Sequence, residues 1–123
     1  MIRGIRGATT VHEDDGAPIL QETEKLLREM ITKNQVNAEA VTSILISVTQ
    51  DIKSEFPAKA LRKIDGWNYV PIMCMQEIPV PDSLEKCIRV LMTVNTEREQ
   101  KEIHHVYLEN AVQLRPDLSI NQK

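Results

Sequence analysis

The chain has 123 residues, which suits one domain, and its hydrophobic fraction of 41% contains only 3% aromatic residues, so the core must be aliphatic. A net charge of −3 makes the chain a poor candidate for bulk nucleic-acid binding, which needs a basic stripe. No apolar run approaches the ~20 residues that cross a bilayer. The first residues also lack the apolar stretch of a signal peptide, so we expect a cytoplasmic protein that contacts no membrane.

The first half of the chain predicts alternating strands and helices. Residues 2–10 are β-branched and punctuated by glycine, which indicates a strand. Apolar residues at helical spacing predict a helix over 18–34, with Pro18 in its first turn. Residues 43–49 are apolar on both faces, as in a covered strand, and a short helix follows over 57–64.

The second half predicts mainly strands. These are expected over 67–75, where Pro71 implies an edge or a bulge, over 87–94 and over 105–108. Short helical turns are expected over 82–86, 96–102 and 109–114, the second of these being a turn or a loop. The order predicts an α/β (α+β) domain over residues 1–123, a mixed β-sheet with helices packed on one face and a mobile tail from about 115. The uncovered apolar face would then need a partner, most simply other copies of the chain.

Cations inside apolar strands are the most informative residues. Arg89 shares a strand face with Cys87 and Leu91, and Arg6 lies between Gly4 and Gly7. Because an unpaired buried charge is costly, each arginine needs an ion pair with an acidic residue, a path to water or an anionic ligand.

Further charged residues could converge on the same ligand. Lys59 and Arg62 share a helical face and Arg115 lies near the C-terminus, so they form either a solvated surface or a site for a small polyanion. Strict alternation puts Cys74 and Glu77 on opposite faces of one strand, unless the strand ends or bulges between them. Cys74 and Cys87 lie in apolar segments and are expected to be free thiols. The three histidines and two cysteines show no metal-ligand spacing, so no metal or cofactor is expected.

Ordered motifs cover nearly the whole chain. They occupy residues 1–10, 56–60, 66–71, 74–77, 86–90, 105–109 and 112–119. In these segments the sequence resembles the small trimeric class of monofunctional bacterial chorismate mutases. The resemblance implies an isomerase that rearranges chorismate to prephenate on the branch toward phenylalanine and tyrosine. It also implies a homotrimer with a shared sheet core and active sites at subunit interfaces.

The same resemblance implies roles for individual residues. Arg89 would lie near the ether oxygen of the breaking bond, Arg6 would hold a substrate carboxylate beside Tyr107, and Glu77 would meet the ring hydroxyl. The wall and mouth of the site would comprise Phe56, Ala58, Lys59, Arg62, Met73, Cys74, Leu114 and Arg115. Met73 departs from the family, which carries a threonine there, and this could alter a contact to the ring hydroxyl.

A [3,3] rearrangement needs no nucleophile, metal or redox group, in agreement with the absence of such motifs. Two alternatives remain open. One is a non-catalytic trimeric module that binds a small carboxylate or an amphipathic partner in the same arginine pocket. The other is an enamine or imine deaminase of the same trimeric fold, although the segment from Cys74 to Glu77 favours the mutase.

Overall fold

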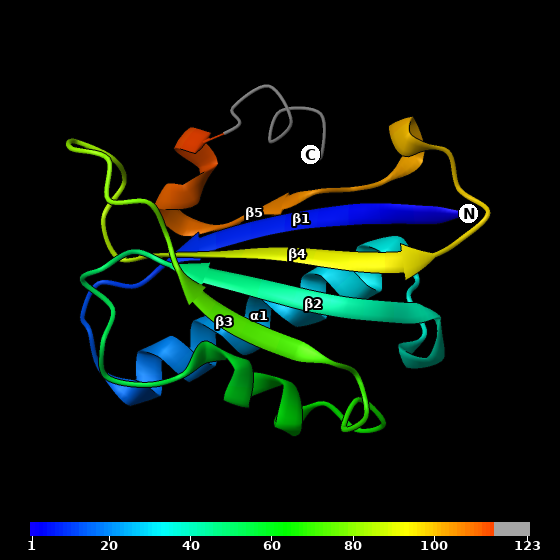
Figure 1. Ribbon diagram of the computed structural model, residues 1–123, viewed down its shortest axis with the longest axis horizontal. Coiled ribbons are helices and arrows are strands. Elements are labelled where there is room, and N and C mark those ends of the chain that lie inside the picture. Colours follow the sequence, from blue (N-terminus) through cyan, green and yellow to red (C-terminus); the bar gives the residue numbers. More distant parts are fainter. Residues whose placement is uncertain (115–123) are drawn as a thin grey trace.

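The structure is a computed structural model that describes residues 1–114, so Arg115 and the rest of the tail lie outside it. Five strands form one mixed sheet in the order β3-β2-β4-β1-β5 (Figure 1). The strands are β1 (Ile2–Thr10), β2 (Val41–Val48), β3 (Ile72–Gln76), β4 (Cys87–Asn95) and β5 (Val106–Tyr107). The central β4 is antiparallel to β1 and β2, whereas the edge strands β5 and β3 run parallel to β1 and β2 respectively. The predicted mixed sheet is confirmed.

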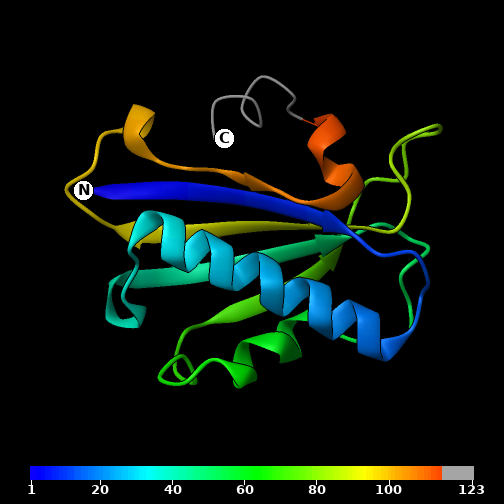
Figure 2. The same ribbon diagram turned by 180° about the vertical axis from the view of Figure 1, so that it is seen from behind.

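One long helix covers one face of the sheet. Helix α1 (Gly16–Asn34) crosses that face diagonally (Figure 2). It begins after Asp15, whose side chain accepts the Gly16 N–H, and ends at Gln35, which adopts a left-handed conformation with φ of 52°. Its apolar stripe is fully buried against the sheet and includes Ile19, Leu26, Leu27 and Met30.

Shorter 3₁₀ helices complete the layer and leave most of the opposite face uncovered. The helix η2 (Pro57–Lys63) packs on α1 beside the edge strand β3, and η1 (Ala38–Ala40) and η3 (Gln100–Glu102) lie in connections. The helix η4 (Glu109–Leu114) differs, because its Ala111 packs with Ala8 and Cys87 at one end of the uncovered face. The helical layer on one face is therefore as predicted, with η4 as the exception.

Alternation in β4 separates the two faces. Ile88, Val90, Met92 and Val94 are buried beneath the helices, and the residues between them face the uncovered side. Apolar side chains of β4 and of its neighbours remain exposed on that side, including Leu45 at 38%, Leu91 at 39% and Met73 at 64%. An exposed apolar sheet face of this kind is typical of a surface that another chain covers.

Two segments differ from the sequence-based expectation. The strand expected from residue 67 begins only at Ile72, because Gly66 has a φ of 86° and turns join Trp67 N to Ile64 O and Val70 N to Trp67 O. The helical turn expected over 82–86 is also wrong. Asp82 and Lys86 have φ values of 64° and 47°, which a right-handed helix does not allow. Within residues 1–114, no helix is both long and apolar enough to span a membrane.

Two fully buried threonines differ in their hydrogen bonding. Thr9 Oγ1 has no partner among residues 1–114, whereas Thr23 Oγ1 donates to Ile19 O at 2.7 Å. We predict that Thr9→Val raises the free energy of unfolding by about 1 kcal/mol, because an unsatisfied buried hydroxyl is replaced by a methyl group of similar size. Thr23→Val, by contrast, removes the hydrogen bond to Ile19 O and should not raise the free energy of unfolding. Urea unfolding of both variants checks this, and equal effects would contradict it.

Gly7 lets α1 approach β1 closely. A Cβ at Gly7 would lie 2.5 Å from Met30 Sδ and 3.1 Å from Leu26 Cδ1. Gly7→Ala should therefore lower the free energy of unfolding by about 1–3 kcal/mol through overpacking. The matched control is Gly16→Ala, where the nearest atom would be 3.9 Å away and little loss is expected. Thermal unfolding of both variants is the measurement, and an undiminished Tm for Gly7→Ala would contradict the packing argument.

Candidate functional site

A cleft of about 340 Å³ lies on the uncovered sheet face, and we call it the sheet-face cleft. Its lining includes Arg6, Leu45, Ser47, Met75, Glu77, Arg89, Leu91 and Tyr107. All four residues predicted as catalytic, Arg6, Glu77, Arg89 and Tyr107, line this one cleft.

Strand register accounts for this convergence. One row of paired residues crosses the whole sheet on this face, from Tyr107 through Ala8, Arg89 and Ser47 to Met75. The small side chains of Ala8 and Ser47 flank Arg89 and leave its guanidinium room. Arg6 belongs to the next row, where it pairs with Leu91, and is therefore a diagonal neighbour of Arg89 at roughly 7–8 Å between backbones.

Arg89 is held by a carboxylate. Its Nη1 lies 3.1 Å from Glu77 Oε2, so the ion pair with an acidic residue, one of the alternatives left open by the sequence, is present. The same Oε2 accepts a hydrogen bond from Ser47 Oγ at 3.0 Å, and Oε1 accepts one from the Ile78 N–H at 3.2 Å. Partial burial pulls the pKa of Glu77 upward, but the hydrogen bonds from Ser47 and Ile78 and the charge of Arg89 outweigh it, and the pKa lies below its ordinary value. Glu77 is therefore an anion at neutral pH.

Arg6 and Tyr107 form the opposite side of the cleft. The Arg6 backbone N–H donates to His105 Nδ1 at 2.9 Å, which ties β1 to the segment before β5. Within the part of the chain that the structure describes, no carboxylate pairs with the exposed Arg6 guanidinium. Tyr107 is half-buried beside it and packs against the cluster formed by Ala8, Cys87 and Ala111. A cation, a phenol and an apolar floor thus lie together at this end.

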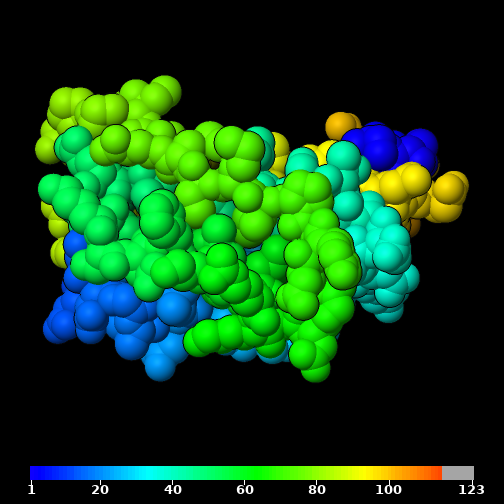
Figure 3. Space-filling view, turned by 60° about the horizontal axis from the view of Figure 1, so that its bottom comes forward, coloured from blue at the N-terminus to red at the C-terminus, as the bar shows by residue number. Residues whose placement is uncertain are grey.

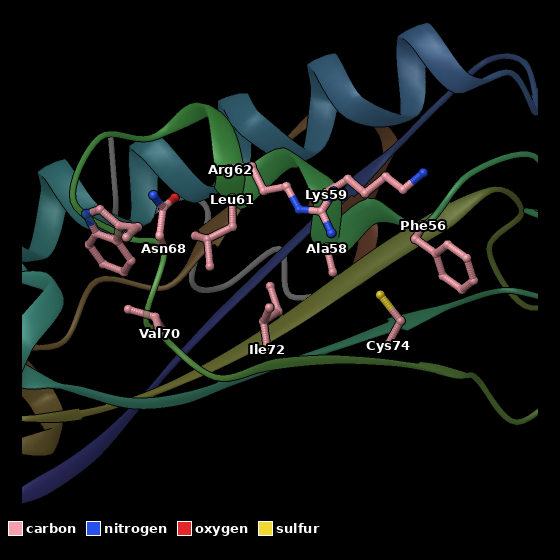
Figure 4. A pocket seen from close by; sticks show the side chains of 10 residues that line it. Phe56, Ala58, Lys59, Leu61, Arg62, Asn68, Val70, Ile72 and Cys74 are labelled. Carbon is pink, nitrogen blue, oxygen red and sulfur yellow. The ribbon is translucent and has the colours of Figure 1, made fainter.

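A second and larger cavity of about 840 Å³ lies between η2 and β3, and we call it the edge groove (Figure 4). Lys59 and Arg62 extend from η2 along one wall, and Cys74 belongs to the opposite wall on β3. Figure 3 views this edge from outside, where the green atoms of η2 lie beside the blue atoms of α1. Of the residues predicted for the wall of the site, the groove brings together Phe56, Ala58, Lys59, Arg62 and Cys74.

Ion pairing modulates the charge of the groove. Lys59 Nζ lies 2.9 Å from Glu55 Oε1, and this hydrogen bond holds the pKa of Glu55 below its ordinary value, with help from the Phe56 N–H. No carboxylate pairs with Arg62 within residues 1–114, so its charge is available to a ligand. Sequence reasoning missed Leu61, Trp67, Asn68, Val70 and Ile72, which also line the groove. Trp67, Asn68 and Val70 belong to the motif at residues 66–71, and this motif is the sequence signal that points to them.

The cleft and the groove lie on opposite sides of the sheet. Cys74 pairs with the buried Ile46 and faces the helical layer, whereas Glu77 faces the uncovered side, so strict alternation predicted their separation correctly. Both cysteines are free thiols. Burial raises the pKa of Cys74, and it raises the pKa of Cys87 to about 11, so neither thiol is ionised at neutral pH.

Three predicted residues lie elsewhere. Met73 is exposed on the uncovered face and lines neither cavity. Leu114, like Tyr107, packs against the cluster of Ala8, Cys87 and Ala111. Arg115 lies outside the described residues. One chain therefore carries two separate cationic surfaces rather than one assembled pocket.

Fold and site define an α+β protein with fixed cationic groups, suited to a small anion rather than to nucleophilic chemistry. A family model described as chorismate mutase type I matches residues 2–118. Chorismate mutase AroH of Bacillus subtilis (strain 168) is 54% identical over 122 residues, which is 99% of this chain and 96% of that protein. Chorismate mutase AroH of Thermus thermophilus is 46% identical over 123 residues, covering 99% of this chain and all of that protein.

A solved structure indicates the same family. The chorismate mutase from Clostridium thermocellum, Cth-682, superposes with a TM-score of 0.86 at 50% identity and covers 89% of this chain and 96% of its own. The chain belongs to the chorismate mutase type I family. The family resemblance, the fold class and the expectation of an isomerase of this type are thereby confirmed.

Proposed function

We propose that this protein rearranges chorismate to prephenate as a homotrimer whose active sites lie between copies of the chain. The observation that carries the proposal is Arg89, a permanent cation on a rigid central strand, oriented by Glu77 inside the sheet-face cleft. Family membership supplies the substrate, and chorismate, being a dianion, matches the charge of the cleft. The setting is aromatic amino acid biosynthesis in the cytoplasm, with residues 1–123 acting as one domain.

The reaction is intramolecular, so atoms are only rearranged. The ether C–O bond breaks while a new C–C bond forms, and negative charge accumulates on the ether oxygen during the transition state. Arg89 would stabilise that charge, and its donors need little reorganisation because Glu77 already orients them. A rate gain of roughly 10⁶-fold requires about 8 kcal/mol, shared between this electrostatic effect and restraint of the substrate.

The other residues of the cleft would bind the substrate in its reactive conformation. Arg6 would take a carboxylate beside Tyr107, and the Glu77 carboxylate would accept a hydrogen bond from the ring hydroxyl. Leu114 and Arg115 would contribute to the wall and mouth of the site, as the family resemblance implies. Together these contacts would hold the enolpyruvyl arm over the ring, which is the geometry that the new C–C bond requires.

The edge groove would complete the site from a neighbouring copy. Phe56, Ala58, Lys59, Arg62 and Cys74 face away from the cleft of their own chain, so they can meet a cleft only when two chains pack together. Met73, on the uncovered face, would lie at this junction. A head-to-tail contact of groove against cleft, repeated around a threefold axis, closes into a ring and covers the apolar sheet faces.

The test of the function is direct. Purified protein is mixed with chorismate, and the loss of chorismate absorbance and the formation of prephenate are followed, while light scattering gives the mass of the assembly. Turnover by a species of three chains is expected. No turnover by a folded trimer would contradict the proposal and favour the binding module or the deaminase, and an active monomer would contradict the shared sites.

Arg89→Ala should lower kcat by about 10²–10³-fold or more with a smaller change in KM, because the lost interaction is strongest in the transition state. Arg89→Lys keeps the positive charge but loses the planar arrangement of donors, so its kcat should lie between those of the wild type and Arg89→Ala. The control is Lys33→Ala on α1, where the lysine pairs with Glu29 outside both cavities. Steady-state kinetics are the measurement, and an unchanged kcat in Arg89→Ala would remove Arg89 from this role.

A further inference from the structure

We propose that Ser47 is a positioning residue, whose hydroxyl fixes the Glu77 carboxylate and thereby directs the guanidinium of Arg89 toward the substrate. The inference rests on the proposed function of the sheet-face cleft, and it concerns a residue to which the family resemblance gave no role. It follows from three contacts to one carboxylate and from the register of the sheet.

The register places Ser47 between the two partners of the ion pair. On β2, Ser47 pairs with Arg89 of β4 on one side and with Met75 of β3 on the other. Glu77 follows the end of β3, and its backbone N–H donates to Val48 O at 2.8 Å, which anchors the carboxylate-bearing residue to β2. The Glu77 side chain therefore crosses β2 at Ser47 to reach Arg89. A small side chain at this position leaves room for the carboxylate, and its hydroxyl can donate a hydrogen bond to it.

The donors divide unequally between the two carboxylate oxygens. Oε2 accepts from both Ser47 Oγ at 3.0 Å and Arg89 Nη1 at 3.1 Å, whereas Oε1 accepts from the Ile78 N–H at 3.2 Å. The terminal torsion of a glutamate is broad, so hydrogen bonds rather than rotamer preference must fix the plane of this carboxylate. Ser47 is the neutral side chain that shares the bridging oxygen with Arg89.

This arrangement limits how much of Arg89 the ion pair occupies. Within residues 1–114, Arg89 bonds to Glu77 through Nη1 alone, which leaves its remaining N–H groups for a ligand. Without the Ser47 hydroxyl, the carboxylate is free to rotate into a two-pronged pair with the guanidinium, the arrangement that arginine and carboxylate favour. The N–H groups of Arg89 that would otherwise bind the ether oxygen would then be occupied by Glu77.

Two readouts separate positioning from a general structural effect. Ser47→Ala should lower kcat about tenfold, the scale of a hydrogen bond to a charged group, with a smaller change in KM. Removal of a donor also raises the pKa of Glu77, so the acid limb of the kcat profile should move to higher pH. Ser47→Thr retains the hydroxyl and should restore both the rate and the position of the acid limb.

The matched control is Ser43→Ala, on the same strand and the same face, where the serine pairs with Thr93. It should leave kcat and the pH profile unchanged. Circular dichroism and assembly mass are recorded for every variant. Should Ser47→Ala fail to fold, Ser47→Cys, which has similar size but a weak donor, takes its place and should show the same two defects.

The outcomes separate this inference from the function on which it rests. If wild-type protein does not turn over chorismate, the proposed function fails. If wild-type protein is active and the folded Ser47→Ala or Ser47→Cys variant matches it in kcat and acid limb, the function stands and the inference is overturned. A tenfold loss with the acid limb shifted to higher pH, restored by Ser47→Thr, supports it.

Discussion

The ion pair between Arg89 and Glu77, on a sheet face that its own chain leaves uncovered, sets the geometry of the candidate site. A cation on an apolar strand needs a partner or a path to water, and half-exposed Arg89 has both, because Glu77 provides a carboxylate from the end of β3. Because β4 is the central strand, its neighbours on both sides fix the position of Arg89. The small residues Ala8 and Ser47 flank it, so the guanidinium remains both oriented and accessible.

The two faces of the sheet give the chain two unlike surfaces. The cleft holds Arg89, which is paired with Glu77, and Arg6, which has no carboxylate partner within residues 1–114, while the edge groove adds Lys59 and Arg62 on the helical side. Alternation along β3 directs Cys74 to the edge groove and Glu77 to the sheet-face cleft, so the groove and the cleft of one chain cannot form a single pocket. The proposed rearrangement, which encloses a dianion in one conformation, would therefore depend on assembly of the chain with its own copies.

Local sequence patterns predict most of the strands and the residues of the cleft. Features that depend on pairing between distant strands cannot be predicted from such patterns. Alternation identified β4, and the unusual arginine within it pointed to the cleft. The start of β3 was placed too early, because the aromatic and β-branched composition of 67–71 suggested a strand while Gly66 and the turns around Trp67 break it. The role proposed for Ser47 depends on the register of three strands, which no spacing within one segment encodes.

Subunit complementation would show whether the cleft of one copy and the groove of another form one active site. Arg89→Ala, with a defective cleft, is mixed and reassembled with Lys59→Ala/Arg62→Ala, with a defective groove, and native mass spectrometry verifies mixed trimers. If each site combines the cleft of one copy with the groove of another, random assembly of equal amounts restores about a quarter of the wild-type activity. Activity equal to the sum of the separate variants, in a sample that contains mixed trimers, would contradict the account.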